Sequence, residues 1–467
     1  MITRRLCASL AVLTLLASPA AAQERPTALV GGTLVDGTGA PAVADAVVVY
    51  RDGRIVCAGP RAVCAVPATA EIVDASGGWI VPGLVDAHVH YSQTGWADGR
   101  PDSYDARDRF PYAATIAERR RNPDDYYRAY LCSGVTATFD VGGFPWTWGL
   151  RDDTERRADA PHVAAAGPLL STRDHWLNTP AERQFIWIGS DSAADEGARY
   201  LVANRTDAIK VWFLVGERTR DADAYVARLM AAGQAAREAG IPLIVHATNL
   251  WGATRAVEAG AHLLVHGVAD GPVDAAFLEG ARAAGTIYTP TLVVGEGYRE
   301  LRNRAFDAGK YGAGMACVDP ATKAKAFLTD SLPNPPSAEQ QAAALERARR
   351  GRELEAANVR AVHLAGIPVA MGTDAGNPLT LHGPSVFLEM EALQAAGLTP
   401  LEVLRSATLV GAMAMGRADD FGSLAAGKLA DILIVDADPL ADIANLRRVR
   451  AAVRSGVLHR REALEWR

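Results

Sequence analysis

The hydrophobic residues follow one pattern at the two ends of the chain and another in its middle. Residues 27–80 contain short β-branched runs separated by Gly, Pro and Asp, and similar runs return at Asp431–Val435 and Val449–Val453. No long helical period interrupts the first group. Short apolar runs bounded by turn residues are typical of β-strands. We therefore expect one small β-sandwich-like domain that is built from both ends of the chain.

The middle of the chain alternates apolar runs with helical stretches such as Asp221–Ala239 and Gly252–Ala259. Repeated strand–helix units predict parallel strands in a (β/α)8 barrel. A segment at about 296–360 is longer than one crossover requires, and its charged, Ala-rich pattern predicts a helical excursion over one end of the barrel. The eight candidate strands are Ile80–His90, Ala137–Val141, His162–Ala166, Ala208–Phe213, Pro242–Ala247, His262–Val268, Thr286–Leu292 and Pro368–Asp374.

The first residues have the pattern of a secretory signal peptide. Arg4 and Arg5 precede an apolar run that is too short to span a membrane, and an Ala-x-Ala cleavage motif follows before Gln23. We therefore expect a periplasmic or secreted protein without a membrane anchor after signal removal. The expected domains are the signal peptide at 1–22, the β-domain at 23–80 and 416–467, and the barrel at 81–415.

Export changes how the cysteines are interpreted, because disulfides persist outside the cytoplasm. Cys57 and Cys64 lie seven residues apart on either side of a Gly-Pro pair. A disulfide between them and a pair of buried thiols are both consistent with this spacing. Cys132 and Cys317 have no nearby partner in the sequence, and we expect them to be unpaired.

Composition narrows the range of partners. The 467 residues are 49% hydrophobic and 22% charged, with a net charge of −6, and so lack the basic excess of a nucleic-acid-binding protein. Of the 48 basic residues only five are lysines. A lysine in an apolar strand is therefore unusual in this chain, and one occurs at Lys210.

Several metal-binding side chains close the predicted strands. Active sites of such barrels lie at the carboxyl ends of the strands. His88 and His90 are two residues apart, so both side chains point to one face. His246 and His266 end the fifth and sixth runs, and Asp374 ends the eighth. Imidazole and carboxylate groups are common zinc ligands, so this edge of the barrel is a candidate metal site.

Two further residues need separate treatment. His262 lies four residues before His266, far below the strand end, and we exclude it from the site. Lys210 lies within the apolar run Ala208–Phe213, where an uncompensated ammonium would cost several kcal/mol. Either Lys210 forms a buried salt bridge, or its amine has reacted with CO2 to give a carbamate that bridges two cations. Arginine has no primary amine and could not do the latter.

Three motifs together resemble the amidohydrolase superfamily, from the end of the signal almost to the C-terminus. They are Pro82–His90, Gly372–Gly376 and Phe421–Val435. The context of Lys210, the two single histidines and His382-Gly383 resemble the prolidase-like and imidazolonepropionase-related branch. That branch includes Xaa-Pro dipeptidases and ochratoxin-degrading amidases.

The resemblance implies a site with two divalent metal ions, expected to be zinc. Residues that match His88, His90 and Asp374 bind the first ion, and those that match His246 and His266 bind the second. Lys210, carboxylated by CO2, bridges them. Asp374 is the implied catalytic residue, first as general base and then as general acid. As substrate contacts we predict His175, Tyr288 and His382.

The implied activity is hydrolysis of amide bonds in a dipeptide or an N-acyl amino acid, and a homo-oligomer is common in the family. The segment Ala247–Trp251 departs from the continuation expected in dipeptidases and leaves the substrate open. Hydrolysis of a lactone, an ester or a cyclic amide, or deamination of a ring, would use the same site. A barrel used for binding without catalysis, or a glycosidase with paired acids, is an alternative of another class.

Overall fold

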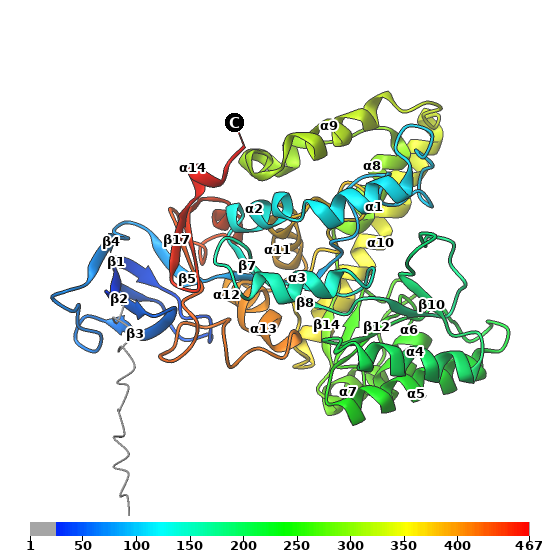
Figure 1. The fold of residues 1–467 in the computed structure, drawn as a ribbon, viewed down its shortest axis with the longest axis horizontal. Coiled ribbons are helices and arrows are strands. Elements are labelled where there is room, and N and C mark those ends of the chain that lie inside the picture. The colour runs from blue at the N-terminus through cyan, green and yellow to red at the C-terminus, as the bar shows by residue number, and fades with distance from the viewer. Residues whose placement is uncertain (1–24, 467) are drawn as a thin grey trace, which may run out of the picture.

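The computed structural model describes residues 25–466, so the predicted signal peptide at 1–22 lies outside the described residues. Both ends of the described chain enter one eight-stranded sheet with the order β17-β16-β15-β5-β1-β2-β3, in which β4 also pairs with β1. This terminal sheet lies to the left in Figure 1. Its strands are β1 (Thr27–Leu34), β2 (Val43–Arg51), β3 (Arg54–Pro60), β4 (Glu71–Asp74), β5 (Trp79–Pro82), β15 (Ile432–Val435), β16 (Val449–Arg454) and β17 (Val457–Arg460).

Strand β2 shows why the terminal sheet is covered on two faces. Val48 packs into one apolar cluster, whereas Val47 and Val49 pack into another, because alternate side chains of a strand point to opposite faces. Cys64 belongs to the second cluster and forms a disulfide with Cys57, with 5.6 Å between the Cα atoms. Of the two possibilities left open by the sequence, the structure shows the disulfide.

The middle of the chain contains two sheets of parallel strands. One has the order β6-β7-β8 and the other β10-β9-β11-β12-β13-β14. Only three residues separate β8 from β9, so one stretch of chain serves both sheets. The strands are β6 (Leu84–Val89), β7 (Val135–Asp140), β8 (His162–Ala165), β9 (Leu169–Ser171), β10 (Phe185–Trp187), β11 (Ile209–Trp212), β12 (Leu243–His246), β13 (Leu263–Val265) and β14 (Ile287–Thr289).

The eighth predicted strand, Pro368–Asp374, differs from the expectation. It forms isolated parallel bridges, from Val369 to Tyr288 and from Ala375 to Val89, and is not a regular strand. The backbone of Asp374 has φ 60°, which is left-handed and ends an extended conformation. The segment nevertheless joins β14 of one parallel sheet to β6 of the other.

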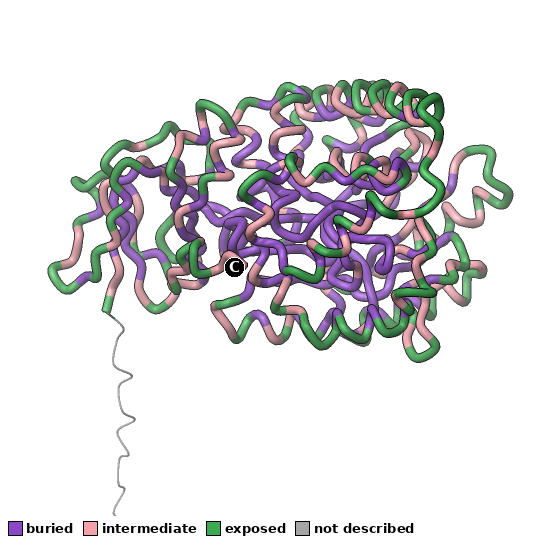
Figure 2. Tube along the Cα trace, turned by 90° about the horizontal axis from the view of Figure 1, so that it is seen from above, coloured by how far each residue is buried: buried purple, intermediate pink, exposed green. Residues whose placement is uncertain are grey.

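Helices connect and cover the parallel strands, as the alternating pattern predicted. Figure 2 shows that buried residues fill the middle of the molecule while the surrounding helical coils expose one side. No helix among residues 25–466 is both long and apolar enough to cross a membrane. Outside residues 294–364, the helices are α1 (Tyr112–Arg121), α2 (Asp124–Cys132), α3 (Thr147–Thr154), α4 (Asp191–Ala203), α5 (Ala222–Ala239), α6 (Leu250–Glu258), α7 (Ala275–Ala284), α11 (Ser385–Ala395), α12 (Pro400–Arg405), η3 (Ser406–Val410), α13 (Gly411–Ala414), η4 (Ile443–Arg447) and α14 (Arg461–Leu464).

Residues 294–364, which we call the excursion, are almost entirely helical. The last helix begins at a capping box, in which Ser337 and Gln340 satisfy each other's backbone N–H groups. A disulfide joins Cys317 of the excursion to Cys132 at the end of α2, so the prediction that both are unpaired is wrong. The excursion consists of α8 (Val294–Asn303), η1 (Ala308–Cys317), α9 (Pro320–Leu328), η2 (Thr329–Ser331) and α10 (Ala338–Leu364).

Candidate metal centre

Backbone hydrogen bonds hold the segment around Asp374 against β6. The buried carboxylate of Asp86 accepts bonds from the Thr373 amide at 2.9 Å and the Thr373 hydroxyl at 2.6 Å. The Asp374 amide then donates to the carbonyl of His88 at 2.8 Å. A Cβ atom at Gly372 would lie 2.9 Å from the Cβ of His88, so only glycine permits this approach. Asp374 is thereby fixed beside the end of β6.

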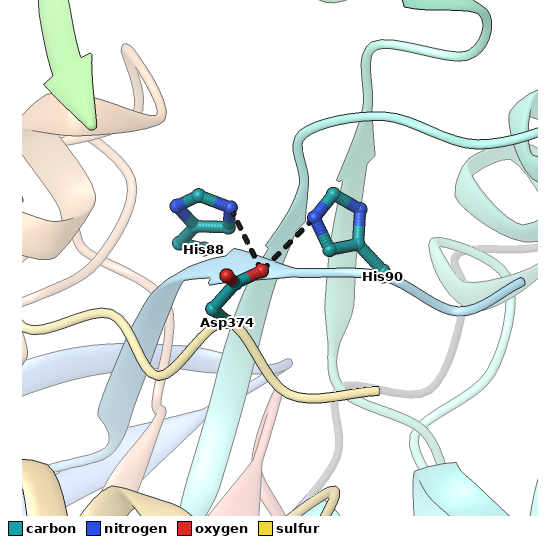
Figure 3. A group of neighbouring side chains, drawn as sticks. All are labelled: His88, His90 and Asp374. Atoms are coloured by element: carbon teal, nitrogen blue, oxygen red, sulfur yellow. Dashed lines mark ion pairs between the residues drawn. The ribbon is translucent and has the colours of Figure 1, made fainter. Parts of the chain in front are cut away.

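Three side chains converge at this point. Oδ1 of Asp374 lies 3.2 Å from Nε2 of His88 and 3.0 Å from Nε2 of His90, and Figure 3 shows both imidazoles directed at the carboxylate. Their candidate ligand atoms all lie within 4.8 Å of one another. His266 approaches from β13, with its Nδ1 3.9 Å from Oδ2 of Asp374. The fold thus brings His88, His90 and Asp374 to one point and places His266 beside them.

Hydrogen bonds to the Nδ1 atoms orient two of these imidazole rings. Nδ1 of His90 lies 2.6 Å from the carbonyl oxygen of Gly142, and Nδ1 of His266 lies 2.8 Å from the hydroxyl oxygen of Thr291. Hydrogen bonds of this kind fix the ring and leave the other nitrogen free for a metal ion. His266 and Asp374 both have positive φ values, 77° and 60°. Such conformations of non-glycine residues cost about 1–3 kcal/mol and concentrate at functional sites.

Lys210 and His246 come from the adjacent strands β11 and β12. Their register pairs Lys210 with Ile244 and Trp212 with His246. The ring of His246 lies 4.3 Å from that of His266, measured between centroids. No hydrogen bond or ion pair reaches the ammonium of Lys210 within the described chain, which excludes the salt bridge considered from the sequence. Burial lowers the pKa of Lys210 to about 7, so much of the amine is neutral near neutral pH.

The donor set fits a divalent metal ion. Burial lowers the pKa of His88 to about 4 and that of His246 to about 3, so both are neutral and able to bind metal at neutral pH. Both ring nitrogens of His88 and Oδ1 of Asp374 are buried without a hydrogen-bond partner. Buried polar groups are rarely left unsatisfied, and a cation would satisfy these. We call His88, His90, Lys210, His246, His266 and Asp374 the ligand cluster.

The ligand cluster lines a pocket of about 300 Å3. Other residues that line this pocket were not predicted from the sequence. The half-buried guanidinium of Arg100 donates two bonds to Asp102, both of 2.9 Å, and another to Asn377. The hydroxyl of Tyr298 donates to the same side-chain oxygen of Asn377 at 2.6 Å. These four residues lie in loops or in the excursion, where no local pattern indicated a role.

The three predicted substrate contacts lie in different places. His175 lines the pocket, with Nε2 3.8 Å from Asp102, and packs near Phe185 and Trp212. The hydroxyl of Tyr288 accepts a bond from the backbone of Val268 and does not line the pocket.

His382 is also buried outside the pocket wall. Its Nδ1 lies 2.8 Å from the hydroxyl of Tyr130 and its Nε2 3.0 Å from the carbonyl of Gln93. Both ring nitrogens are therefore engaged within the protein. His262, excluded from the site on sequence grounds, lies 3.1 Å from the carbonyl of Met413 and does not line the pocket either.

Comparisons with known proteins agree with this geometry. An imidazolonepropionase of Methylobacterium sp. (strain 4-46) is 30% identical over 260 residues, which are 49% of this chain. The alignment spans 61% of the length of that relative.

Solved structures cover more of the chain. A Xaa-Pro dipeptidase with bound methionine in its active site has a TM-score of 0.69 at 21% identity, covering 93% of this chain and 100% of that one. The ochratoxinase of A. niger has a TM-score of 0.70 at 20% identity, covering 93% and 96%. Likeness at this level of identity shows a shared fold.

The family itself follows from a sequence model. The model of the amidohydrolase family matches residues 79–458. This range contains all six residues of the ligand cluster and extends from β5 of the terminal sheet, through both parallel sheets, to β17. Since the match includes well over half of the chain, the protein belongs to the amidohydrolase family.

Proposed function

We propose that this protein is a metal-dependent hydrolase that cleaves amide bonds of small substrates, of the dipeptide or N-acyl amino acid type. The observation that carries the proposal is the convergence of His88, His90 and Asp374 in a pocket that also contains Lys210, His246 and His266. The likeness in fold to a Xaa-Pro dipeptidase and an ochratoxinase supports it. We also take the two parallel sheets as one (β/α)8 barrel and the terminal sheet as a β-sandwich, as such relatives imply.

The ligand cluster divides into two halves that suit two ions, for which zinc is the expected metal. His88, His90 and Asp374 would hold one, and His246 and His266 the other. We infer that Lys210 is carboxylated by CO2 and contributes to both, because its amine is buried without a partner. Divalent ions at such a site polarise a carbonyl group and lower the pKa of water.

Asp374 performs the proton transfers in this proposal. As a carboxylate it accepts the proton of the attacking water, and it then donates this proton to the nitrogen of the leaving amine. The hydrogen bond from its amide to His88 and the bridge between Ala375 and Val89 hold the carboxylate in place between the two steps. Arg100, Tyr298 and Asn377 form the polar wall beside it.

Export remains a proposal as well. The signal-like residues 1–22 indicate a periplasmic or secreted protein, and two disulfides among the described cysteines support this location. A homo-oligomer is expected from the resemblance alone.

Metal removal combined with a substrate panel tests the proposed function. Purified protein is assayed on a library of dipeptides and on N-acyl amino acids, before and after dialysis against a strong chelator. We expect amide hydrolysis that disappears on dialysis and returns with Zn2+, and metal analysis should give two ions per chain. Amide hydrolysis that survives full metal removal would contradict the proposal.

A second candidate function is hydrolysis of a cyclic amide. The sequence relatives include imidazolonepropionases, among them the Methylobacterium protein. Including imidazolonepropionate in the same panel separates the two candidates. Turnover of this compound without turnover of any linear amide would favour the second.

A further inference from the structure

One carboxylate in the pocket has no partner. Glu355 lies on α10 of the excursion and lines the same pocket as the ligand cluster. Its side chain packs beside Gly267, where a Cβ atom would lie 3.4 Å from Cγ of Glu355. Within residues 25–466 no hydrogen bond or ion pair reaches its carboxylate. Arg352, one turn earlier on the helix, pairs with Glu296 at 3.4 Å and acts on Glu355 only from beyond ion-pair distance.

The other carboxylates of the pocket are all compensated. Asp102 accepts two hydrogen bonds from the guanidinium of Arg100. Oδ1 of Asp374 lies 3.2 Å from Nε2 of His88 and 3.0 Å from Nε2 of His90. Lys210 forms no ion pair with Glu355. Of the pocket carboxylates, that of Glu355 is thus the one without a hydrogen bond or ion pair among the described residues.

Partial burial makes the carboxylate of Glu355 energetically costly as long as no cation is bound beside it. Partial burial of Glu355 raises the pKa of its carboxyl to about 7. A half-buried carboxylate without a hydrogen-bond partner loses part of its hydration, and no direct partner replaces it. A cation bound in the pocket would supply such a partner. Glu355 and Asp374 line the same pocket of about 300 Å3, so that one ligand can contact both.

We propose that Glu355 is a specificity-determining residue that binds a protonated amine of the substrate. This inference rests on the proposed amide hydrolysis and decides between its two substrate types. The enzyme then prefers amides with a free amino group, such as dipeptides, over their N-acylated counterparts. The excursion supplies the selective group, and the strand ends supply the ligands.

Paired substrates test this assignment. Each dipeptide that is hydrolysed is assayed beside its N-acetylated copy, for the wild type, Glu355→Gln and the control Glu353→Gln. Glu353 lies on the same helix and does not line the pocket. For the wild type we expect kcat/KM at least about tenfold higher with the free amine. Glu355→Gln should remove this preference, mainly through KM, and Glu353→Gln should keep it.

Binding measurements make the test independent of catalysis. Calorimetry compares L-methionine with N-acetyl-L-methionine as probes for the metal-loaded wild type and Glu355→Gln. We expect the wild type to bind L-methionine at least about tenfold more tightly than its acetylated form, and the variant to bind the two alike. If this pattern holds but no amide is cleaved, the proposed function fails and the assignment of Glu355 stands.

Two results would overturn the assignment. The first is a wild type that binds and hydrolyses the acetylated compounds at least as well as the free amines. The second is a Glu355→Gln enzyme that loses the same factor on both classes, because Glu355 would then serve the chemistry or the fold and not the amine.

Discussion

The two sides of the pocket are built in different ways. The ligand cluster comes from strand ends and the segments after them. Gly142 and Thr291 hold His90 and His266 by short hydrogen bonds, and Asp86 holds Thr373, the neighbour of Asp374. The excursion contributes side chains from helices, such as Tyr298 and Glu355, of which Glu355 is held by no hydrogen bond. The difference indicates that the strand ends fix the chemistry and that the excursion can vary without disturbing it.

The strongest test of this comparison changes Asp374 to Asn. The variant keeps the shape of the side chain but cannot accept the proton of water, so we expect kcat to fall about 1,000-fold or more. The melting temperature should stay within a few degrees of the wild type. The exposed Asp223→Asn on α5 is the control and should retain full activity. If the kcat of Asp374→Asn exceeded a tenth of the wild-type value, Asp374 would not be the general base.

A second change at the strand ends is Lys210→Arg. The guanidinium keeps a positive charge but cannot form a carbamate, so we expect at least about 100-fold loss of activity and fewer than two bound metal ions. Metal content is measured by elemental analysis of the folded protein. Wild-type activity with two metals in this variant would refute the carbamate.

Thr291→Ala tests the support behind the cluster. Without the hydroxyl that lies 2.8 Å from Nδ1 of His266, we expect metal affinity to fall roughly 10–100-fold. Competition with a coloured chelator measures this affinity. Thr291→Ser keeps a hydroxyl and should bind metal nearly as the wild type does. Equal loss in both variants would mean that the methyl group, and not the hydrogen bond, matters.

The smallest effect is expected on the excursion side. Tyr298→Phe removes one hydrogen bond to Asn377, so we expect kcat/KM to fall roughly three- to tenfold with metal content unchanged. Tyr200→Phe, at an exposed position on α4, is the matched control. Loss of bound metal in Tyr298→Phe would contradict the division between the two sides.

The same division explains what could be predicted from the sequence. His88, His90 and His246 end apolar runs, and the two-residue period of a strand together with the polarity of parallel sheets places them in space. The structure accordingly brings all six residues of the ligand cluster into one pocket. The predicted eighth strand is not regular in the structure: within it only Val369 forms a bridge, and Asp374 at its end is left-handed.

Side chains outside strand ends could not be placed in this way. Arg100 lies in a loop. Glu355 lies on a helix whose position depends on contacts with residues far away in the sequence. Cys132 and Cys317 are 185 residues apart, and nothing local to either indicates that α2 and the excursion meet. His382 followed a family motif, but the structure buries it beneath the pocket, between Tyr130 and Gln93.

The passage from β5 to β6 has a consequence for how this protein can evolve. A single residue, Gly83, separates the last pairing of the terminal sheet from the strand that carries His88 and His90. In the sheet, β5 pairs with β15 from the opposite end of the chain. Recombination that exchanged the terminal sheet for another module would have to cut within a few residues of these histidines. The sheet and the metal centre are therefore expected to be inherited together, while insertions in the excursion diversify separately.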